Sequence, residues 1–446
     1  MRRAVTKAVS SKPEAIYFTA AQLSARGRAA IPDALISHTR LIYSSPATLA
    51  YNSPGAEGFG VKRAGLAVPE SVMLIVSPGC CGRNTSALSE LPAYRHRFFY
   101  LTMDETDLVT GRHLTKIPQA VCEVVESLAQ KPVVVMICIT CVDALLGTDM
   151  ERVCRKAESA AGVRVRPCYM YALTREGQCP PMVHVRQSLY SLLEPARRRS
   201  TSVNLLGYFT PLVDDCELYG LLRQAGVRQI REISRMTDFA AFGQMAEANF
   251  NLVLNAEALP AAQDLEKRLG MPFIQLTRLY QIDKIENQYA ALGQALGMAF
   301  DFEADRGRAL AAQTALGEAH PDLTFAVGEV QNANPFELAL ALLQAGFGVL
   351  EIFGTAMPEV YPWIERIAKL SPGTRIYSNL EPSMLYYKAA VRPDITIGAD
   401  AAYYHPDVPN LRWNDEAQPF GFAGLRRFYQ GVAAALTKAE TNERSS

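Results

Sequence analysis

The sequence lacks a net charge and a long apolar run, and its second half lacks cysteine. Its 446 residues carry 45 Lys and Arg against 45 Asp and Glu, so the formal net charge is zero. A balanced charge removes the electrostatic case for nucleic acid or an anionic membrane as the main partner. No apolar run approaches the roughly 20 residues of a membrane-spanning helix, so we expect no membrane span.

Several motifs are also missing. No GxxxxGK[ST] sequence is present, so we expect no ATP site of the P-loop kind in this chain. No GxGxxG follows the first strands, so a dinucleotide site is not predicted. The N-terminal MRRAVTKAVSSKPEA is basic but has no apolar segment of the kind found in secretory signals. We therefore expect a cytoplasmic protein with reduced thiols.

The cysteines are few and unevenly placed. Nine in 446 residues, an odd number, is too sparse for a disulfide scaffold. In a reducing compartment, clustered cysteines indicate metal binding, redox chemistry or core packing. All nine lie in the first half: Cys80, Cys81, Cys122, Cys138, Cys141, Cys154, Cys168, Cys179 and Cys216.

Short apolar segments alternate with amphipathic ones along most of the chain. This alternation predicts parallel sheets with right-handed crossovers, that is, doubly wound α/β domains. Two of the amphipathic segments, CELYGLLRQAG and PFELALALLQAG, end on a glycine suited to a helix C-cap. The predicted buried strands are residues 72–76, 133–139, 203–207, 251–255, 273–276, 324–329, 349–354, 375–379 and 394–399.

The spacing of these segments predicts three Rossmann-like domains behind an N-terminal arm. The boundaries expected are residues 1–65 for the arm, 66–198 for the first domain, 199–320 for the second and 321–440 for the third. The cysteines concentrate in the first domain, so any chemistry that depends on thiols belongs there.

Two cysteine motifs follow predicted strands of that first domain. The strand 72–76 leads into SPGCCGRNT, which places Cys80 and Cys81 in a glycine-flanked turn. The strand 133–139 leads into TCVDALLGTD, with Cys141 just past its end and Cys138 inside it. Ligands of open parallel sheets bind beyond the carboxyl ends of the strands. A thiolate pair at this edge could hold an iron–sulfur cluster.

Other readings of the same residues stay open. Cys138, inside an apolar strand, also fits a buried core thiol. The Cys138-x-x-Cys141 spacing is compatible with zinc or a redox pair, although no second CxxC pair is present. The six histidines form no metal-binding pattern. If protons must be delivered, His113, His184 and Asp149 are the candidates.

The chain resembles the nitrogenase component 1-type oxidoreductase family across roughly residues 50–436. The motifs that carry the resemblance are NSPGAEGFGV, SPGCCGRNT, TCVDALLGTD, VNLLGYFTPLVDDCELYGLLRQAGV, NLVLNAEAL and the C-terminal YYHPDVPNLRWNDEAQPFGFAGLRRFY. The resemblance implies three Rossmann-like domains and a dimeric or tetrameric assembly. It also implies electrons supplied by a separate ATP-hydrolysing iron protein.

The resemblance also implies a cluster at a subunit interface. The family's GPxGC turn matches SPGCCG, which makes Cys81 the expected ligand with Cys80 in reserve. Cys141 matches a second ligand, with Cys138 in reserve. The family's first cluster cysteine has no counterpart, because Asn52 and Ser53 stand there. Two thiols from each of two chains would complete a [4Fe–4S] cluster, in a homodimer or with a second component 1-type subunit.

A second departure concerns the large metal cofactor of nitrogenase. The family's cysteine ligand matches Asn255 here, and its histidine ligand falls near Arg412, close to His405. Neither Asn255 nor Arg412 is a soft-metal ligand. The leading hypothesis is a reductase subunit that receives low-potential electrons through the interface cluster. The alternative is a non-catalytic scaffold for assembly of a metal cofactor, and a third reading is an α/β protein whose cysteines only pack.

Overall fold

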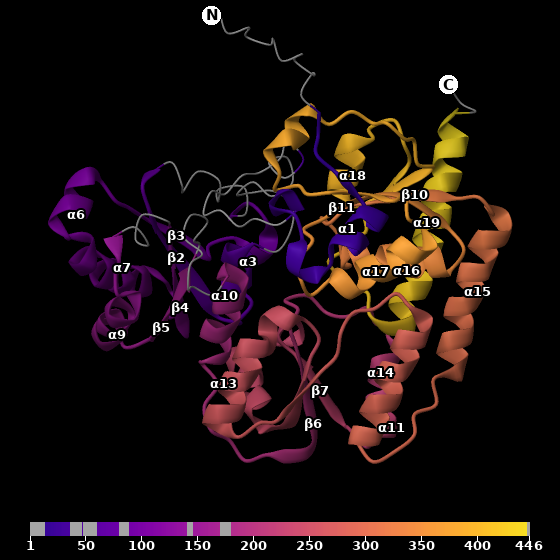
Figure 1. Cartoon of the computed structure of the whole chain (residues 1–446). Helices are drawn as coiled ribbons and strands as arrows, with labels where there is room; N and C mark the ends of the chain where they lie inside the picture. The colour runs from indigo at the N-terminus through magenta and orange to yellow at the C-terminus, as the bar shows by residue number, and fades with distance from the viewer. Residues whose placement is uncertain are drawn as a thin grey trace, which may run out of the picture. The chain divides into compact units, whose positions relative to one another are not determined.

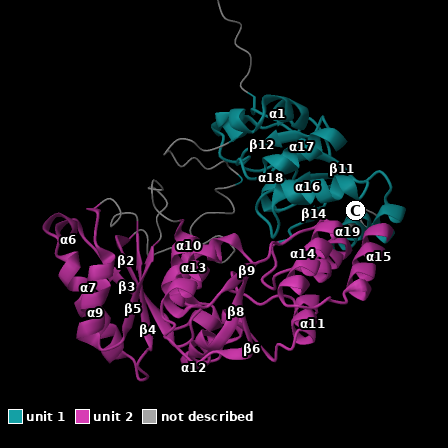
Figure 2. Ribbon diagram, turned by 60° about the horizontal axis from the view of Figure 1, so that its bottom comes forward, with its two compact units in different colours: residues 1–51, 315–413, 431–446 teal, residues 52–314, 414–430 magenta. Residues whose placement is uncertain are grey.

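The computed structural model describes residues 14–35, 47, 60–79, 89–140, 146–169 and 180–443 (Figure 1). The chain divides into two compact units, which Figure 2 colours separately. Unit 1 comprises residues 1–51, 315–413 and 431–446, and unit 2 comprises residues 52–314 and 414–430. The described strands form three sheets, two in unit 2 and one in unit 1.

The first sheet of unit 2 has four parallel strands in the order β3-β2-β4-β5. They are β2 (Ser71–Ser77), β3 (Phe98–Thr102), β4 (Val134–Ile139) and β5 (Arg164–Tyr169). Strands β2 and β4 occupy the centre, and both are buried along their whole length. That burial explains their nearly continuous apolar sequences, which are typical of parallel strands covered on both faces.

Helices cover both faces of this sheet (Figure 1). On one face, Val72, Leu74 and Val76 pack with residues of α7 (His113–Ser127) and α9 (Met150–Ala161). On the other face, Met73 and Ile75 pack with residues of α3 (Val61–Gly65) and α10 (Pro181–Tyr190). The alternation of β2 side chains between two cores follows from the two-residue repeat of a strand. The first sheet is therefore doubly wound, as predicted.

The second sheet, also in unit 2, has the order β7-β6-β8-β9, again all parallel. Its helix α11 ends near Gly226, whose φ of +81° is the left-handed conformation expected of a C-cap glycine. The strands are β6 (Arg199–Leu206), β7 (Gln229–Glu232), β8 (Ala248–Val253) and β9 (Phe273–Gln275), and the helices that follow β6 to β9 include α11 (Glu217–Gln224), α12 (Phe239–Gly243), α13 (Leu259–Leu269), α14 (Ile282–Ala295) and α15 (Glu303–Ala319).

The sheet of unit 1 has six strands in the order β1-β12-β11-β10-β13-β14. Strands β11 and β12 lie on one side of β10, and β13 and β14 lie on its other side. The chain therefore changes direction across the sheet between β10 and β13, which makes this place a topological switch point. The strands are β1 (Phe18–Thr19), β10 (Thr324–Val327), β11 (Gly348–Phe353), β12 (Arg375–Tyr377), β13 (Ile395–Ile397) and β14 (Asn410–Leu411); the helices are α1 (Ala20–Arg26), α16 (Pro335–Gln344), α17 (Tyr361–Leu370) and α18 (Ala399–Tyr404), and α19 (Gly421–Glu443) contributes to both units.

Part of the predicted N-terminal arm belongs to this third sheet. Strand β1 pairs antiparallel with β12, and the hydroxyl of Tyr361 donates to the carbonyl of Leu23 in α1 at 3.0 Å. Helix α3, at the end of the predicted arm, packs instead in unit 2. No helix in the described part of the chain is long and apolar enough to span a membrane. The three predicted domain boundaries stay predictions.

Candidate functional site

The two predicted cysteine turns begin at neighbouring strand ends. Strands β2 and β4 lie side by side in parallel, and Val76 is paired with Ile139 in their register. The chain therefore leaves both strands at the same edge of the first sheet. The predicted ligands Cys80, Cys81 and Cys141 lie outside the described residues, as do Asn52 and Ser53. What the structure describes is the frame from which these turns start.

The residue before Cys141 carries an unusual buried hydroxyl. Thr140 is 1% exposed, and its Oγ1 has no hydrogen-bond partner among the described residues. A buried polar atom without a partner costs free energy, so a polar group that bonded to this hydroxyl would stabilise this edge of the sheet. Thiolates at adjacent strand ends suit iron–sulfur chemistry. The part of the chain that the structure describes contains no group of three His, Cys, Asp or Glu side chains that could hold a metal ion.

The reserve ligand Cys138 lies in the core and not at the edge. Its side chain belongs to the apolar cluster between the first sheet and helices α3 and α10. It pairs in register with Cys168 of β5, and the Cys168 Sγ donates to the carbonyl of Val61 at 3.5 Å. Contact with Cys138, together with burial, raises the pKa of Cys168 and keeps it a neutral thiol. Cys138 thus makes the contacts of a packing residue.

The carboxyl ends of β6 and β8 meet at a close approach. Gly207 has a φ of +132°, and a Cβ at this position would lie 2.7 Å from the backbone nitrogen of Asn255. Asn255, the position matched to a cofactor-binding cysteine, accepts a hydrogen bond from the backbone nitrogen of Glu257 at 2.9 Å. Its side-chain oxygen therefore caps the short helix that follows, a structural role.

The buried guanidinium of Arg186 forms hydrogen bonds at this edge of the sheet. This residue was not identified from the sequence. Arg186 of α10 donates to the carbonyl of Gly207 from Nε at 2.9 Å and from Nη2 at 2.6 Å. Its Nη1 lies 2.8 Å from Oε2 of Glu257 and 2.7 Å from the carbonyl of Met182. Burial lowers the pKa of Arg186, and Phe209 lies under its guanidinium at 4.6 Å. Arg186 therefore connects α10 to the carboxyl ends of β6 and β8.

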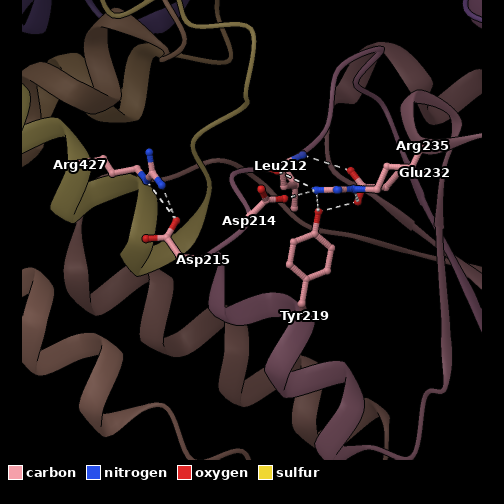
Figure 3. Close-up of polar contacts among 7 residues, drawn as sticks. All are labelled: Leu212, Asp214, Asp215, Tyr219, Glu232, Arg235 and Arg427. Carbon is pink, nitrogen blue, oxygen red and sulfur yellow. Dashed lines mark hydrogen bonds and ion pairs between the residues drawn. The ribbon is translucent and has the colours of Figure 1, made fainter.

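The segment after β6 is held by a network around Glu232 (Figure 3). The Glu232 carboxylate accepts from the hydroxyl of Tyr219 at 2.5 Å, from the backbone nitrogen of Leu212 at 3.1 Å and from Nε of Arg235 at 3.0 Å. Arg235 also reaches Asp214, with 2.7 Å between Nη2 and Oδ1. The guanidinium of Arg235 lies between the two carboxylates in Figure 3. Burial and Glu232 raise the pKa of Tyr219.

The remaining acids of this segment fix the start of α19. The carboxylate of Glu217 accepts from the backbone nitrogens of Phe422 at 2.6 Å and Ala423 at 3.0 Å. Asp215 pairs with Arg427 at 2.8 Å, separately from the Glu232 network (Figure 3). A carboxylate at a helix N-terminus satisfies amides that have no partner within the helix. The acidic residues of VDDCEL therefore have structural roles, as partners of arginines and of the backbone amides of α19.

An acidic pair lies at the topological switch point of the third sheet. Asp400, after β13, accepts from the backbone nitrogen of Glu329 at 2.9 Å, and Asn379 donates to both carboxylates, at 3.0 Å to Glu329 and 2.8 Å to Asp400. The backbone nitrogen of Thr355 donates to Glu329 at 3.1 Å. Burial and the neighbouring Asp400 raise the pKa of Glu329 to about 7. A carboxyl with this pKa can hold or release a proton near neutral pH.

The three proton-delivery candidates occupy separate places. His113 is buried at the start of α7, with its Nδ1 3.1 Å from the carbonyl oxygen of Asp107. His184 lies on α10 against the ring of Tyr169 at 4.2 Å, and burial lowers its pKa. Asp149 caps α9 by accepting from the backbone nitrogen of Arg152 at 2.9 Å. The described contacts do not bring the three together.

The two residues near the matched histidine position differ in burial. His405 is buried in unit 1, where its Nε2 lies 2.7 Å from Oε2 of Glu351 and 3.0 Å from the hydroxyl of Tyr387. Arg412 is exposed and directly follows β14. His405 therefore belongs to an internal polar cluster of unit 1.

Comparison with known proteins gives a family and a fold. A family model described as nitrogenase component 1 type oxidoreductase matches residues 57–437. The chain is 28% identical over 249 residues to the nitrogenase iron-molybdenum cofactor biosynthesis protein NifE of Klebsiella pneumoniae, covering 50% of this chain and 53% of that protein. The NifE protein of Nostoc sp. is 24% identical over 256 residues, or 56% and 52% of the two chains. The chain thus spans about half the length of these relatives.

A solved structure, nitrogenase Cp1 at pH 6.5, superposes with a TM-score of 0.70 at 16% sequence identity. The superposition covers 93% of this chain and 97% of that one. At this identity the likeness concerns the fold, and it agrees with the three sheets and their covering helices described above.

Proposed function

The chain belongs to the nitrogenase component 1 type oxidoreductase family. Within this family, we propose that it is a cofactor-assembly protein, which holds a metal–sulfur precursor and then transfers it. The observation that supports this proposal most directly is the hydrogen bond made by the side chain of Asn255. Its oxygen caps a helix at 2.9 Å, where the resemblance places the cysteine that anchors a resident cofactor. A site that lacks this thiolate ligand would bind a metal cofactor less tightly, which suits a protein that later releases it. The relatives named for cofactor biosynthesis support the same role.

We further propose that Cys81 and Cys141 ligate an iron–sulfur cluster, with Cys80 in reserve. Strands β2 and β4 deliver both turns to one edge of the first sheet, and the buried hydroxyl of Thr140 lies beside the second turn. Cys138 is the weaker reserve because its thiol lies in the core. Two thiols per chain imply a second component 1-type subunit, or a second copy, that supplies the other two. When bound, such a cluster supplies one-electron transfer.

The second candidate function is a reductase subunit supplied with electrons by an ATP-hydrolysing iron protein. The acidic pair at the switch point favours it, because Glu329 has a pKa of about 7. A carboxyl of that pKa, at the carboxyl edge of a parallel sheet, could hold and return the proton that a reduction consumes. In both functions the chain's own residues bind, orient and exclude water, and the electron chemistry belongs to the cluster.

A transfer experiment distinguishes the two functions. The chain is purified anaerobically with its partner subunit, loaded with radioactive iron and mixed with a cofactor-free component 1 acceptor. Assembly function predicts that label moves to the acceptor and that acceptor activity appears, without turnover by the chain itself. Turnover of a substrate with an iron protein and ATP, and no movement of label, would contradict it and support the reductase.

A further inference from the structure

A pocket of about 490 Å³ lies beside strand β7, at the outer edge of the second sheet. Its lining includes four arginines: Arg223, Arg228, Arg231 and Arg235. The acidic side chains of the lining are Asp214 and Glu232, so the pocket carries two more positive than negative charges. The chain as a whole has no net charge, which makes this local excess a feature of the pocket.

Two of the four arginines are fixed in the pocket wall. Arg235 is held between Asp214 and Glu232, at 2.7 and 3.0 Å (Figure 3). Arg231 is buried, and its Nη2 lies 2.8 Å from Oε1 of Gln229 and 3.2 Å from Oε2 of Glu247. Carboxylates therefore neutralise these two guanidinium groups, and their positions are set before any ligand arrives.

The other two arginines have no such partners. Arg223, in the last turn of α11, and Arg228, directly before β7, are both exposed. Neither guanidinium forms a hydrogen bond or an ion pair with the residues that the structure describes. Each guanidinium offers five N–H donors in a planar fork, the geometry that matches the oxygens of a phosphate or carboxylate.

Arg223 and Arg228 could each have a separate structural role. Arg223 near a helix C-terminus interacts favourably with the helix dipole, and Arg228 beside an edge strand discourages pairing with another chain. Neither role requires the two groups to share a pocket with fixed arginines and the amide of Gln229. The convergence of donors in one concave site is what indicates a ligand.

We propose that this pocket binds a compact dianion of the phosphate-monoester or dicarboxylate class, with Arg223 and Arg228 as its principal ligands. Such anions fit a pocket of this size, and their paired oxygens accept bidentate hydrogen bonds from guanidinium forks. Arg231 and Arg235, which carboxylates already neutralise, form part of the wall and leave the charge of the ligand to Arg223 and Arg228. The inference does not rest on the proposed cofactor chemistry, because all the residues involved lie outside the cysteine turns.

The test measures binding of inorganic phosphate to the full-length protein by isothermal titration at constant ionic strength, with succinate as the dicarboxylate probe. Wild-type protein should bind one phosphate per chain saturably. Arg223→Ala and Arg228→Ala should each weaken binding about tenfold, because each removes charge-assisted hydrogen bonds. Arg366→Ala, which removes an exposed arginine on α17, is the matched control and should bind like wild type.

The outcomes are decisive in either direction. Competition by succinate at similar concentration would assign the dicarboxylate class, and preference for phosphate would assign the phosphoryl class. Equal binding by wild type and by the Arg223→Ala/Arg228→Ala double variant would overturn the proposal. So would an absence of saturable binding up to about 10 mM phosphate, since a site that weak has no selectivity over salt. Circular dichroism on each variant confirms that the fold is retained.

Discussion

Replacing Glu329 by glutamine tests the electrostatics of the switch point. Burial and Asp400 raise the pKa of this carboxyl from 4.5 to about 7. Between those pH values the unfolded chain has lost the proton while the folded chain keeps it. The folded state therefore loses stability as pH rises through this window, by about 2–3 kcal/mol between pH 5 and pH 8. Glutamine cannot ionise, so the variant escapes that loss.

The assay is urea denaturation at pH 5 and pH 8, followed by tryptophan fluorescence. Both tryptophans, Trp363 and Trp413, lie in unit 1, so the signal reports the unit that contains Glu329. The free energy of unfolding of Glu329→Gln, relative to wild type, should rise by about 2–3 kcal/mol from pH 5 to pH 8. The pKa of about 7 already includes the hydrogen bonds that Asn379 and Thr355 donate to Glu329, so they need no separate allowance.

A matched control is Glu365→Gln, which changes an exposed glutamate on α17 in the same unit. Its stability difference from wild type should stay constant with pH to within about 0.5 kcal/mol. A Glu329→Gln difference that is equally flat would refute the reasoning. It would mean that Glu329 ionises normally in the folded protein.

Three further predictions concern close approaches. Gly328→Ala should destabilise unit 1 by about 1–3 kcal/mol in the same fluorescence assay, because a Cβ there overlaps the Asp400 carboxylate, whereas Gly373→Ala, with open space around it, should be near neutral. Gly421→Ala should raise the susceptibility of α19 to proteolysis, because Gly421 has a φ of +60° and its Cβ would overlap Glu217. Arg186→Met should lower the melting temperature, because it leaves the Gly207 carbonyl without its hydrogen-bond donor. If the stability, the proteolysis rate or the melting temperature of a variant equals that of wild type, the contact invoked for that variant is wrong.

Apolar patterning predicted the central strands well. All nine strands expected from the sequence are present, among them β2 and β4, whose buried residues leave no ambiguity. The described strands that were missed include β3, β5 and β7, each at the edge of its sheet. β3 and β7 have exposed positions, which need no apolar side chain. β5, with the sequence RVRPCY, even contains Pro167, which edge positions tolerate.

The candidate site was predictable only where local sequence determines it. The two cysteine turns could be assigned to one edge because each directly follows a buried strand. Arg186 and Glu329 could not be found in this way, since their roles depend on contacts with Gly207 and Asp400, which lie 21 and 71 residues further along the chain. Single charged residues within helices or loops carry no signal of such partners. The three-dimensional arrangement was needed to identify them.

The central claim is that Cys81 and Cys141 hold an iron–sulfur cluster between two subunits. The most direct measurement is iron and sulfide content, with an EPR spectrum, on anaerobically purified protein with and without its partner subunit. We expect about two iron atoms per chain. Cys81→Ser or Cys141→Ser should remove most of the iron, and Cys122→Ser, on α7, should not. Iron near zero in the wild-type complex, or iron unaffected by Cys141→Ser, would contradict the account.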